Sequence, residues 1–563
     1  MKRVIAMLFA ALANQCCPAQ DTADLILFNG KVITADRNST IRSAVVVRDG
    51  KVLAVGDDRI AAQYTAPVRI DLKGRALLPG FNDNHLHPTS QSPRAIDADQ
   101  ARSIAQLQQM LRDKARQLGP GEWITGYGWA EANLAEQRNP LRSDLDAACP
   151  RNPVVLVRAG GHSAVGNSLA LNLAKIDRST SAPLRGVIEH DAKGEPNGLI
   201  RERVDLYSSL VPQDSFQTLR PSYVAGLKRL TTLGLTSITV AAASIGDEVE
   251  EIRRPEQPYV ALTFKQLRNI YDQYGESLPR ATVGISYPGP KALAAYPHRT
   301  GYGDDRLKLG AIGEMPAVDG GFTGPTAWTS QDYHGQPGFR GQPFFDEPDL
   351  QALADDVAKN GWQLGLHAIG DAAIDMAVRV YAKALEKFPG QDPRWYLAHF
   401  TMRPKVETQD LMARIGIIGA AQPNFLYTLE NRYFQTLDGE RLEHINPVAG
   451  PLKRGVILSF GSDNLPIDPR VGLYAAVTRK GLSGARVFGP DEAIPVQEAI
   501  RLYTAGTAFM THDDAKKGTI EPGKFADLIV LDRDPLTVPA EQLLTMQVDM
   551  TFIGGKRVYS RRQ

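Results

Sequence analysis

The chain contains very little cysteine: three residues in 563, of which Cys16 and Cys17 fall within the first 20 positions. If that segment is removed, Cys149 remains alone, which excludes an intramolecular disulfide. An excess of charge of one sign is also absent, with 64 Lys and Arg against 63 Asp and Glu. Because a balanced chain has no global attraction for nucleic acid or for an anionic membrane, a small molecule is the expected partner.

No internal repeat or low-complexity tract is present, and the apolar run at residues 4–13 is too short to span a bilayer. Lys2 and Arg3 precede this run, and small residues follow it. This order is typical of a secretory signal peptide over residues 1–20, so we expect an exported protein, periplasmic or secreted, whose mature chain begins near Asp21. Two alternatives stay open: a frayed N-terminal helix of a cytosolic protein, and a lipoprotein anchored through Cys16.

Both ends of the chain read as short strands with glycine turns. Asn29-Gly30 and Asp49-Gly50 are hairpin signals in the first segment, and residues 526–532 and 550–559 show the same pattern near the C-terminus. Neither end supplies enough strands for a stable sheet. The sequence therefore predicts one composite β-sandwich domain from residues 21–75 and 513–563, with the middle of the chain inserted between them.

Residues 76–512 alternate strand and helix patterns, with helices expected at 349–360 and 372–388. Eight strands in this alternation predict an α/β fold, a (β/α)8 TIM barrel, although a doubly wound sheet would read similarly. The candidate strands are 77–85, 236–241, 281–287, 307–315, 363–367, 395–399, 415–420 and 456–461.

The stretch from about 88 to 217 is too long for one connection between a strand and a helix. It predicts an inserted subdomain over the mouth of the barrel. The tryptophan and tyrosine side chains of residues 123–129 either line a pocket there or fill the core of the subdomain itself.

Histidines stand at the ends of several predicted strands. His85 and His87 are two residues apart, so on a strand both imidazoles point to one side and can hold a divalent metal. Two histidines at this spacing, taken alone, are equally explained by an exposed loop. However, His367 and His399 end two further strands, and Asp463 follows the last one. Active sites of TIM barrels lie at this rim, which predicts one metal site from all five side chains. A strand-end cap is the alternative role for Asp463.

This ordered set of motifs, together with residues 504–508 and 518–528, resembles the metal-binding series of the amidohydrolase superfamily. Within it the chain is similar to amidohydrolase family 3, the subgroup that contains N-substituted formamide deformylase, over residues 24–559. The resemblance implies one or two divalent metal ions per chain, with Zn2+ expected. It implies that His85 and His87 bind the more buried ion, that His367 and His399 bind a second ion or serve the substrate, and that Asp463 is both ligand and general base.

The fourth predicted strand departs from the pattern of that family, many members of which carry a carboxylated lysine there. Lys308 lies early in the strand, too deep to reach the rim, whereas Glu314 lies near its end. A glutamate offers the same charge and two oxygens as a carbamate, so Glu314 is a candidate bridging ligand, with a non-coordinating carboxylate as the alternative.

His162, in a glycine-rich stretch, matches a histidine of the family. It is a candidate to hold the substrate carbonyl over the metals, and a structural hydrogen bond is the alternative reading.

The leading functional hypothesis is metal-dependent hydrolysis of a carbon–nitrogen bond, in a small amide, N-acyl or N-formyl compound other than a peptide, by attack of metal-bound hydroxide. Hydrolysis of an ester, lactone or phosphoester at the same site is the alternative. A third hypothesis, an exported non-catalytic metal-binding protein, is disfavoured by the general base Asp463. We expect pocket residues from the insertion and from the loops after strands four and seven, including residues 422–425. The sequence leaves the substrate and the oligomeric state open, a homo-oligomer among the alternatives.

Overall fold

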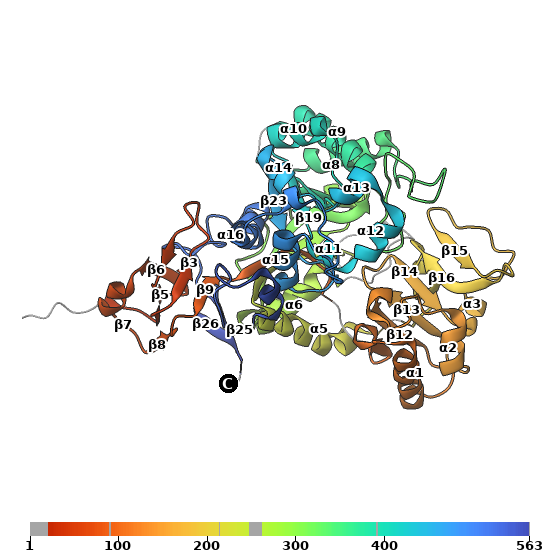
Figure 1. Ribbon diagram of the computed structural model, residues 1–563, viewed down its shortest axis with the longest axis horizontal. Helices are drawn as coiled ribbons and strands as arrows, with labels where there is room; N and C mark the ends of the chain where they lie inside the picture. Colours follow the sequence, from red (N-terminus) through yellow and green to blue (C-terminus); the bar gives the residue numbers. More distant parts are fainter. Residues whose placement is uncertain (1–20, 89–91, 213, 247–261, 390–391, 562–563) are drawn as a thin grey trace, which may run out of the picture.

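The computed structural model describes residues 21–88, 92–212, 214–246, 262–389 and 392–561. Residues 1–20, where the sequence predicts a signal peptide, lie outside these ranges. A barrel occupies the middle of the molecule, with a β-sandwich at one end and the inserted subdomain at the other (Figure 1). None of the helices in the described ranges combines the length and the apolar character needed to cross a membrane.

Eight parallel strands form the barrel, and their spatial order follows their order in the chain. A doubly wound sheet would reverse that order at a switch point, so the predicted TIM barrel is confirmed. Its helices include α8 (Glu347–Lys359) and α9 (Asp371–Lys387). The strands are β10 (Phe81–Leu86), β17 (Leu235–Ala243), β18 (Arg280–Ile285), β19 (Leu307–Ala317), β20 (Leu364–Ala368), β21 (Tyr396–His399), β22 (Ile418–Ala421) and β23 (Ile457–Phe460).

Side chains join the first and last barrel strands, because β10 and β23 share no strand ladder in the described chain. Asp83 accepts hydrogen bonds from the backbone nitrogen of Ser462, at 3.0 Å, and from its hydroxyl. Asn84 Nδ2 donates to Ser459 Oγ at 2.9 Å. Burial raises the pKa of Asp83 to about 6, although the hydrogen bonds from Ser462 act to lower it. The polar residues of this seam, the contact between β10 and β23, thus close the barrel.

The run predicted as one strand at 77–85 is two strands in the structure. β9 (Ala76–Pro79) pairs with β3 (Lys31–Ile33) and β24 (Leu528–Leu531) in the sandwich, and β10 begins the barrel only after Gly80. A Cβ atom at Gly80 would lie 2.1 Å from the hydroxyl of Thr236, so the chain passes here only as glycine. Phe81 prolongs the apolar run just beyond Gly80, so the sequence does not mark the point of crossing.

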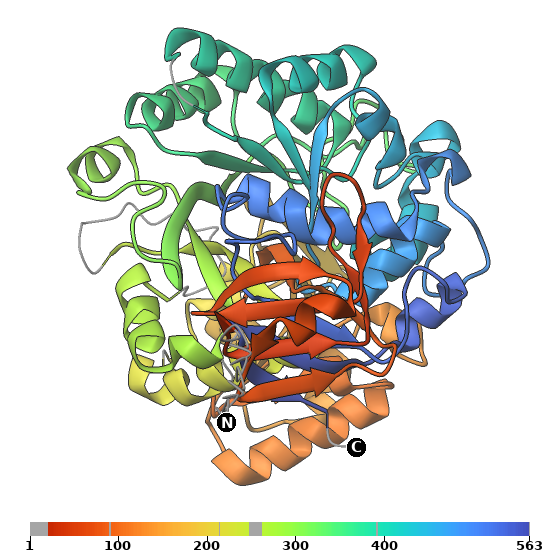
Figure 2. The same ribbon diagram turned by 90° about the vertical axis from the view of Figure 1, so that its left-hand side faces the viewer.

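The sandwich contains two sheets, of four and six strands. The six-stranded sheet takes strands from both chain ends, which confirms the predicted composite architecture. Figure 2 shows the red N-terminal strands and the dark blue C-terminal strands layered together in front of the barrel. The four-stranded sheet runs β6 (Lys51–Gly56), β5 (Ala44–Arg48), β2 (Leu25–Phe28), β8 (Val68–Asp71); the other runs β26 (Lys556–Ser560), β25 (Val548–Ile553), β24, β9, β3, β4 (Ile41–Arg42).

The insertion folds around its own six-stranded sheet and confirms the predicted subdomain. Trp123 and Trp129 lie in its hydrophobic core rather than in a pocket, and Cys149 is a buried free thiol there. Tyr127 instead reaches the loop before His162, where its hydroxyl accepts from the backbone of Gly160 at 3.2 Å. The sheet order is β11 (Ala95–Asp97), β12 (Ile124–Trp129), β13 (Val154–Arg158), β14 (Ser163–Gly166), β16 (Pro196–Arg201), β15 (Val187–His190), and the helices α1 (Ile104–Leu118), α2 (Arg142–Ala148) and α3 (Ser168–Leu173) belong to it.

A three-residue charge cluster links the insertion to the barrel. Glu131, in the insertion, accepts two hydrogen bonds from Arg158 at the end of β13, both at 2.9 Å. Its carboxylate also lies 2.8 Å from Arg432 Nε, on the barrel helix α12 (Glu430–Thr436). One carboxylate therefore pairs with two guanidinium groups at the junction.

Candidate metal centre

The carboxyl ends of four barrel strands, together with Asp463 beyond a fifth, bring the predicted ligands together. Ligand atoms of each of three overlapping trios lie within 4.8 Å of one another. Glu314, His85 and His399 each belong to two of these trios, and Glu314 is the carboxylate among them. The trios are His85, His87 and Glu314; Glu314, His367 and His399; and His85, His399 and Asp463.

The Glu314 carboxylate faces the pair of histidines from the first strand. Its Oε1 lies 3.5 Å from His85 Nε2 and 3.3 Å from His87 Nε2. The nearest oxygen of Asp463 lies 3.8 Å from the same His87 nitrogen. These separations are longer than good hydrogen bonds, and they suit atoms that share a cation between them.

Two buried imidazole nitrogens in the cluster make no hydrogen bond with any described part of the chain. They are the Nε2 atoms of His85 and His399, whose rings lie 4.6 Å apart. Leaving a buried polar atom without a bonding partner costs free energy, so a partner such as a bound ion is expected here. Neutral imidazole nitrogens beside carboxylate oxygens are the donors that Zn2+ prefers, so the residues present fit a divalent metal ion.

A chain of amide side chains fixes the orientation of His399. Gln422 Nε2 donates to Asn84 Oδ1 and to a backbone carbonyl, so its Oε1 is left to accept from His399 Nδ1 at 2.9 Å. The proton of the ring therefore resides on Nδ1, and Nε2 keeps a lone pair directed at the cluster. A hydrogen bond from the ring nitrogen that faces away from the ion is typical of metal-binding histidines.

The backbone is strained at three of the candidate ligands. Glu314, His399 and Asp463 have φ values of 49°, 77° and 53°, in the left-handed region that side chains other than glycine and asparagine rarely adopt. A register shift in the pairing of β19 with β20 follows Glu314 directly. Such conformations cost about 1–3 kcal/mol each and cluster at functional sites.

The electric field inside the cluster favours positive charge. Burial opposes a charge on His87, but Glu314 and then Asp463 outweigh it and raise the pKa of His87 to about 9. Burial also opposes ionisation of Glu314, yet His87 and His85 hold the pKa of that carboxyl well below its usual range. Glu314 is thus a carboxylate, and the charge that it attracts can be carried by a metal ion.

The two histidines on the opposite side of the cluster are neutral. Burial and then the neighbouring His162 lower the pKa of His367 to about 4. Burial and then His367 hold the pKa of His399 well below its usual range. An uncharged ring is the form that binds a metal.

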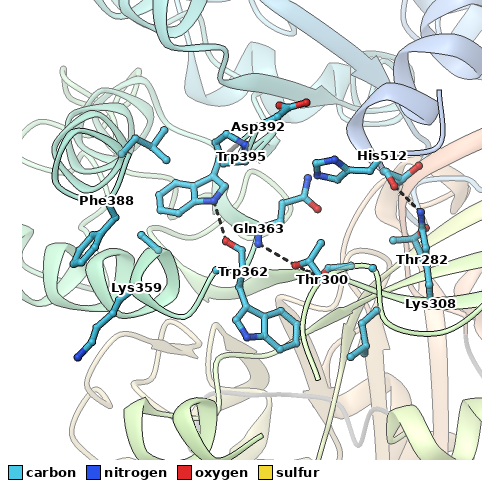
Figure 3. A pocket seen from close by; sticks show the side chains of 18 of the residues that line it. Thr282, Thr300, Lys308, Lys359, Trp362, Gln363, Phe388, Asp392, Trp395 and His512 are labelled. Carbon is cyan, nitrogen blue, oxygen red and sulfur yellow. Dashed lines mark hydrogen bonds between the residues drawn. The ribbon is translucent and has the colours of Figure 1, made fainter. Parts of the chain in front are cut away.

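Lys308 lies at the other end of the barrel, as the sequence predicts. Its Nζ donates to Asp513 at 2.5 Å and to the carbonyl of Thr511 at 2.7 Å. Lys308 and Thr511 line a cleft of about 870 Å³ together with Gln363 and Trp395, which precede β20 and β21 (Figure 3). The cleft therefore lies at the amino ends of the strands, away from the histidines of the candidate metal centre.

His162 reaches the metal centre from the insertion. Its ring lies 5.6 Å from that of His367, and its Nδ1 lies 2.9 Å from Glu202 Oε2. Burial disfavours a charge on His162, but Glu202 outweighs it and raises the pKa of the imidazole to about 8. The structure thus brings all six predicted ligands and His162 into one site.

Sequence reasoning missed three residues that support this site. Glu202 is 40 positions from His162 in the chain, and the pairing of β14 with β16 brings their side chains together. Gln422, expected in the pocket, instead holds His399. Asp319 accepts from the backbone of Ile369 and Gly370, at 3.0 and 2.8 Å, and so fastens the loop after β19 to the end of β20. An Asp-Gly pair after a strand was the available signal for Asp319.

Comparisons with known proteins agree with this geometry. A sequence model described as the amidohydrolase family matches residues 69–559. The chain is 29% identical over 555 residues to N-substituted formamide deformylase from Arthrobacter pascens, covering 96% of this chain and 98% of that protein. It is 28% identical over 552 residues to the putative amidohydrolase YtcJ of Bacillus subtilis, covering 95% and 99%. An uncharacterised metal-dependent hydrolase from Pyrococcus horikoshii shares the fold, with a TM-score of 0.67 and 23% identity over 92% of this chain and 99% of that one.

Proposed function

Because the chain belongs to the amidohydrolase family and brings together a set of candidate metal ligands, we propose that it is a metal-dependent hydrolase of the carbon–nitrogen bond in a small amide, N-acyl or N-formyl compound. One observation carries the proposal: two buried, unpartnered imidazole nitrogens face a cluster in which a single carboxylate, Glu314, is shared by two histidine groups. The full-length similarity to a protein named N-substituted formamide deformylase supports the choice of a carbon–nitrogen bond.

The donor set accommodates two divalent ions, for which we propose Zn2+. His85 and His87 would hold one ion and His367 and His399 the other, with Glu314 between them. A bound divalent metal polarises a carbonyl oxygen and brings the pKa of a water molecule to roughly 7.

Asp463 is our candidate general base. Its side chain is buried, and Oδ1 is fixed by the backbone nitrogen of Asn464 at 2.6 Å. A carboxylate held in this way can take a proton from the attacking water and return it to the nitrogen that leaves, so no external acid is needed. His162, on the insertion, would hold the carbonyl oxygen of the substrate.

The test combines elemental analysis with a panel of matched amide and ester substrates, using protein stripped of metal and then reloaded with zinc. We expect hydrolysis of N-acyl or N-formyl amines that disappears on stripping and returns with zinc. The Asp463→Asn protein serves as the inactive blank, and Asp438→Asn, at an exposed carboxylate, as the active control. Turnover of esters alone would replace the proposed substrate class, and a metal-free active enzyme would refute the proposal.

We also propose that the protein is exported. The order of basic, apolar and small residues in the first 20 positions supports a cleaved signal peptide, with a lipid anchor on Cys16 as the alternative. A mature exported chain would carry Cys149 as its single thiol.

A further inference from the structure

One further group of histidine and carboxylate side chains gathers in the described chain, and it shares no residue with the candidate metal centre. We call it the His444 trio: His444, Asp491 and Glu492, whose ligand atoms lie within 4.8 Å of one another. His444 directly follows α13 (Gly439–Glu443), and the two carboxylates end a short 3-10 helix, Pro490–Glu492. The trio therefore joins two separate segments of the chain.

Glu492 is the fixed member of the trio. Its side chain is only 1% exposed, and its Oε2 accepts from the backbone nitrogens of Val448 and Gly450, both at 2.8 Å. The other oxygen, Oε1, makes no hydrogen bond with the described residues. A Cβ atom at position 450 would lie 2.6 Å from Oε1, so glycine is needed to leave that oxygen its place. Oε1 is thus held in position with its lone pairs unused.

The His444 ring turns a buried nitrogen towards the carboxylates. Nδ1 is shielded from solvent and makes no hydrogen bond with any described part of the protein. It lies 3.7 Å from Glu492 Oε1 and 3.8 Å from Asp491 Oδ2, too far for a hydrogen bond to either. Because a buried polar atom without a partner costs free energy, a bound species between these three atoms is expected.

The two carboxylates of the trio also lack a strongly basic partner. Within the described ranges, neither Asp491 nor Glu492 forms an ion pair with a lysine or an arginine; the basic group within 4 Å of each is His444. The buried guanidinium of Arg479 donates instead to three backbone carbonyls, those of Ile445, Asn446 and Phe488. Arg479 therefore fixes the chain that follows His444 and leaves the space between the carboxylates to a cation.

We propose that the His444 trio binds a zinc ion through His444 Nδ1, Glu492 Oε1 and a carboxylate oxygen of Asp491. Donors at about 2.0–2.2 Å from zinc lie about 3.3–3.6 Å apart in a tetrahedral site, so the two contacts need to shorten by only about 0.1–0.5 Å. Asp491, whose side chain is 65% exposed, is free to make this movement. An imidazole among the donors favours zinc over calcium or magnesium, and water would complete the coordination.

The ion would have a structural role. Asn446, two residues after His444, donates from its backbone nitrogen to the carbonyl of Thr401 at 2.7 Å, just beyond the end of β21. Zinc at the trio would therefore stabilise a segment that supports the rim next to His399, since an ion that binds only the folded chain favours it by mass action. This inference is independent of the proposed function, because it uses none of the residues of the metal centre.

Zinc alone is the probe, counted by elemental analysis of the full-length protein. The protein is first saturated at a buffered free zinc concentration and then dialysed against zinc-free buffer. We expect Asp491→Asn and His444→Gln to hold about one ion per chain fewer than wild type at saturation, because each removes one of three protein ligands. Since Asp491 is exposed, this ion should be the first to leave wild type on dialysis. His334→Gln, at an exposed imidazole 3.2 Å from the single carboxylate of Asp438, is the matched control and should bind as much zinc as wild type.

Asp491→Asn keeps the test open even where His444→Gln does not fold, because the substituted side chain is exposed; circular dichroism verifies the fold. Equal zinc contents in wild type and folded Asp491→Asn would overturn the proposal and leave only an ion pair between His444 and the carboxylates. Displacement of the ion by calcium at the same free concentration would overturn the assignment of zinc. If no amide or ester is hydrolysed, the proposed function fails, and the zinc count still tests the His444 trio.

Discussion

Replacing Glu131 by glutamine should lower the free energy of unfolding by about 3 kcal/mol, because this carboxylate is paired with two arginines at the junction of insertion and barrel. Burial alone would raise the pKa of Glu131, but Arg158 and then Arg432 overcome it and lower the pKa from 4.5 to about 2. At about 1.4 kcal/mol for each pH unit, this fall is worth about 3 kcal/mol. Removing one partner of a buried ion pair costs a similar amount, about 3–5 kcal/mol.

The assay is urea denaturation followed by tryptophan fluorescence, read at the first transition, since a chain of several units need not unfold in one step. Because the folded pKa of Glu131 is depressed, its contribution is fully present above pH 4.5 and is lost as the pH falls towards 2. The difference between wild type and Glu131→Gln should therefore narrow below about pH 4.5. Glu189→Gln, at a partly exposed pair, is the matched control and should cost less than about 1 kcal/mol. A Glu131→Gln protein within about 0.5 kcal/mol of wild type at pH 7 would refute this reasoning.

Three further results are expected. Asp463→Asn should keep the fold and the metal but lose kcat by several orders of magnitude, because an amide is a poor proton acceptor; near-normal turnover with metal bound would exclude Asp463 as the base. Glu314→Gln should lower the metal content from about two ions per chain towards one, measured by elemental analysis, and an unchanged content would mean that Glu314 is not the bridge. Protein recovered from its host should begin near Asp21 and contain one titratable thiol, Cys149; mass spectrometry that found an intact first methionine would contradict export, and lipid on Cys16 would indicate an anchored form.

The strands β20 and β21 could be predicted because each is a short, mainly apolar run with a histidine at or next to its end. The predicted strands at 363–367 and 395–399 become β20 (Leu364–Ala368) and β21 (Tyr396–His399), so both histidines fall at the expected rim. The boundary at Gly80 could not be predicted, since apolar residues flank the glycine directly on both sides and only the contact with Thr236 reveals the crossing.

The supporting residues could not be predicted from local pattern, because their partners are distant in the chain. Gln422 acquires its role from three hydrogen bonds, to His399, to Asn84 and to the backbone, all set by the order of strands around the barrel. The left-handed backbone of Asp463 has no signature in sequence either, because the tertiary structure imposes it.

The seam between β10 and β23 leads us to expect that the metal centre assembles late in folding. Asp83 and Ser462 are 379 positions apart, so their contact closes a very long loop, and we expect it to form after the intervening strands have paired. The neighbours of these two residues are His85 and Asp463, whose backbones also bond across the seam at 2.8 Å. A nascent or partly unfolded chain with an open seam therefore holds only a fragment of the ligand set. A metal ion that binds the closed form alone stabilises closure by mass action, so the supply of that metal should also set the lifetime of the native protein.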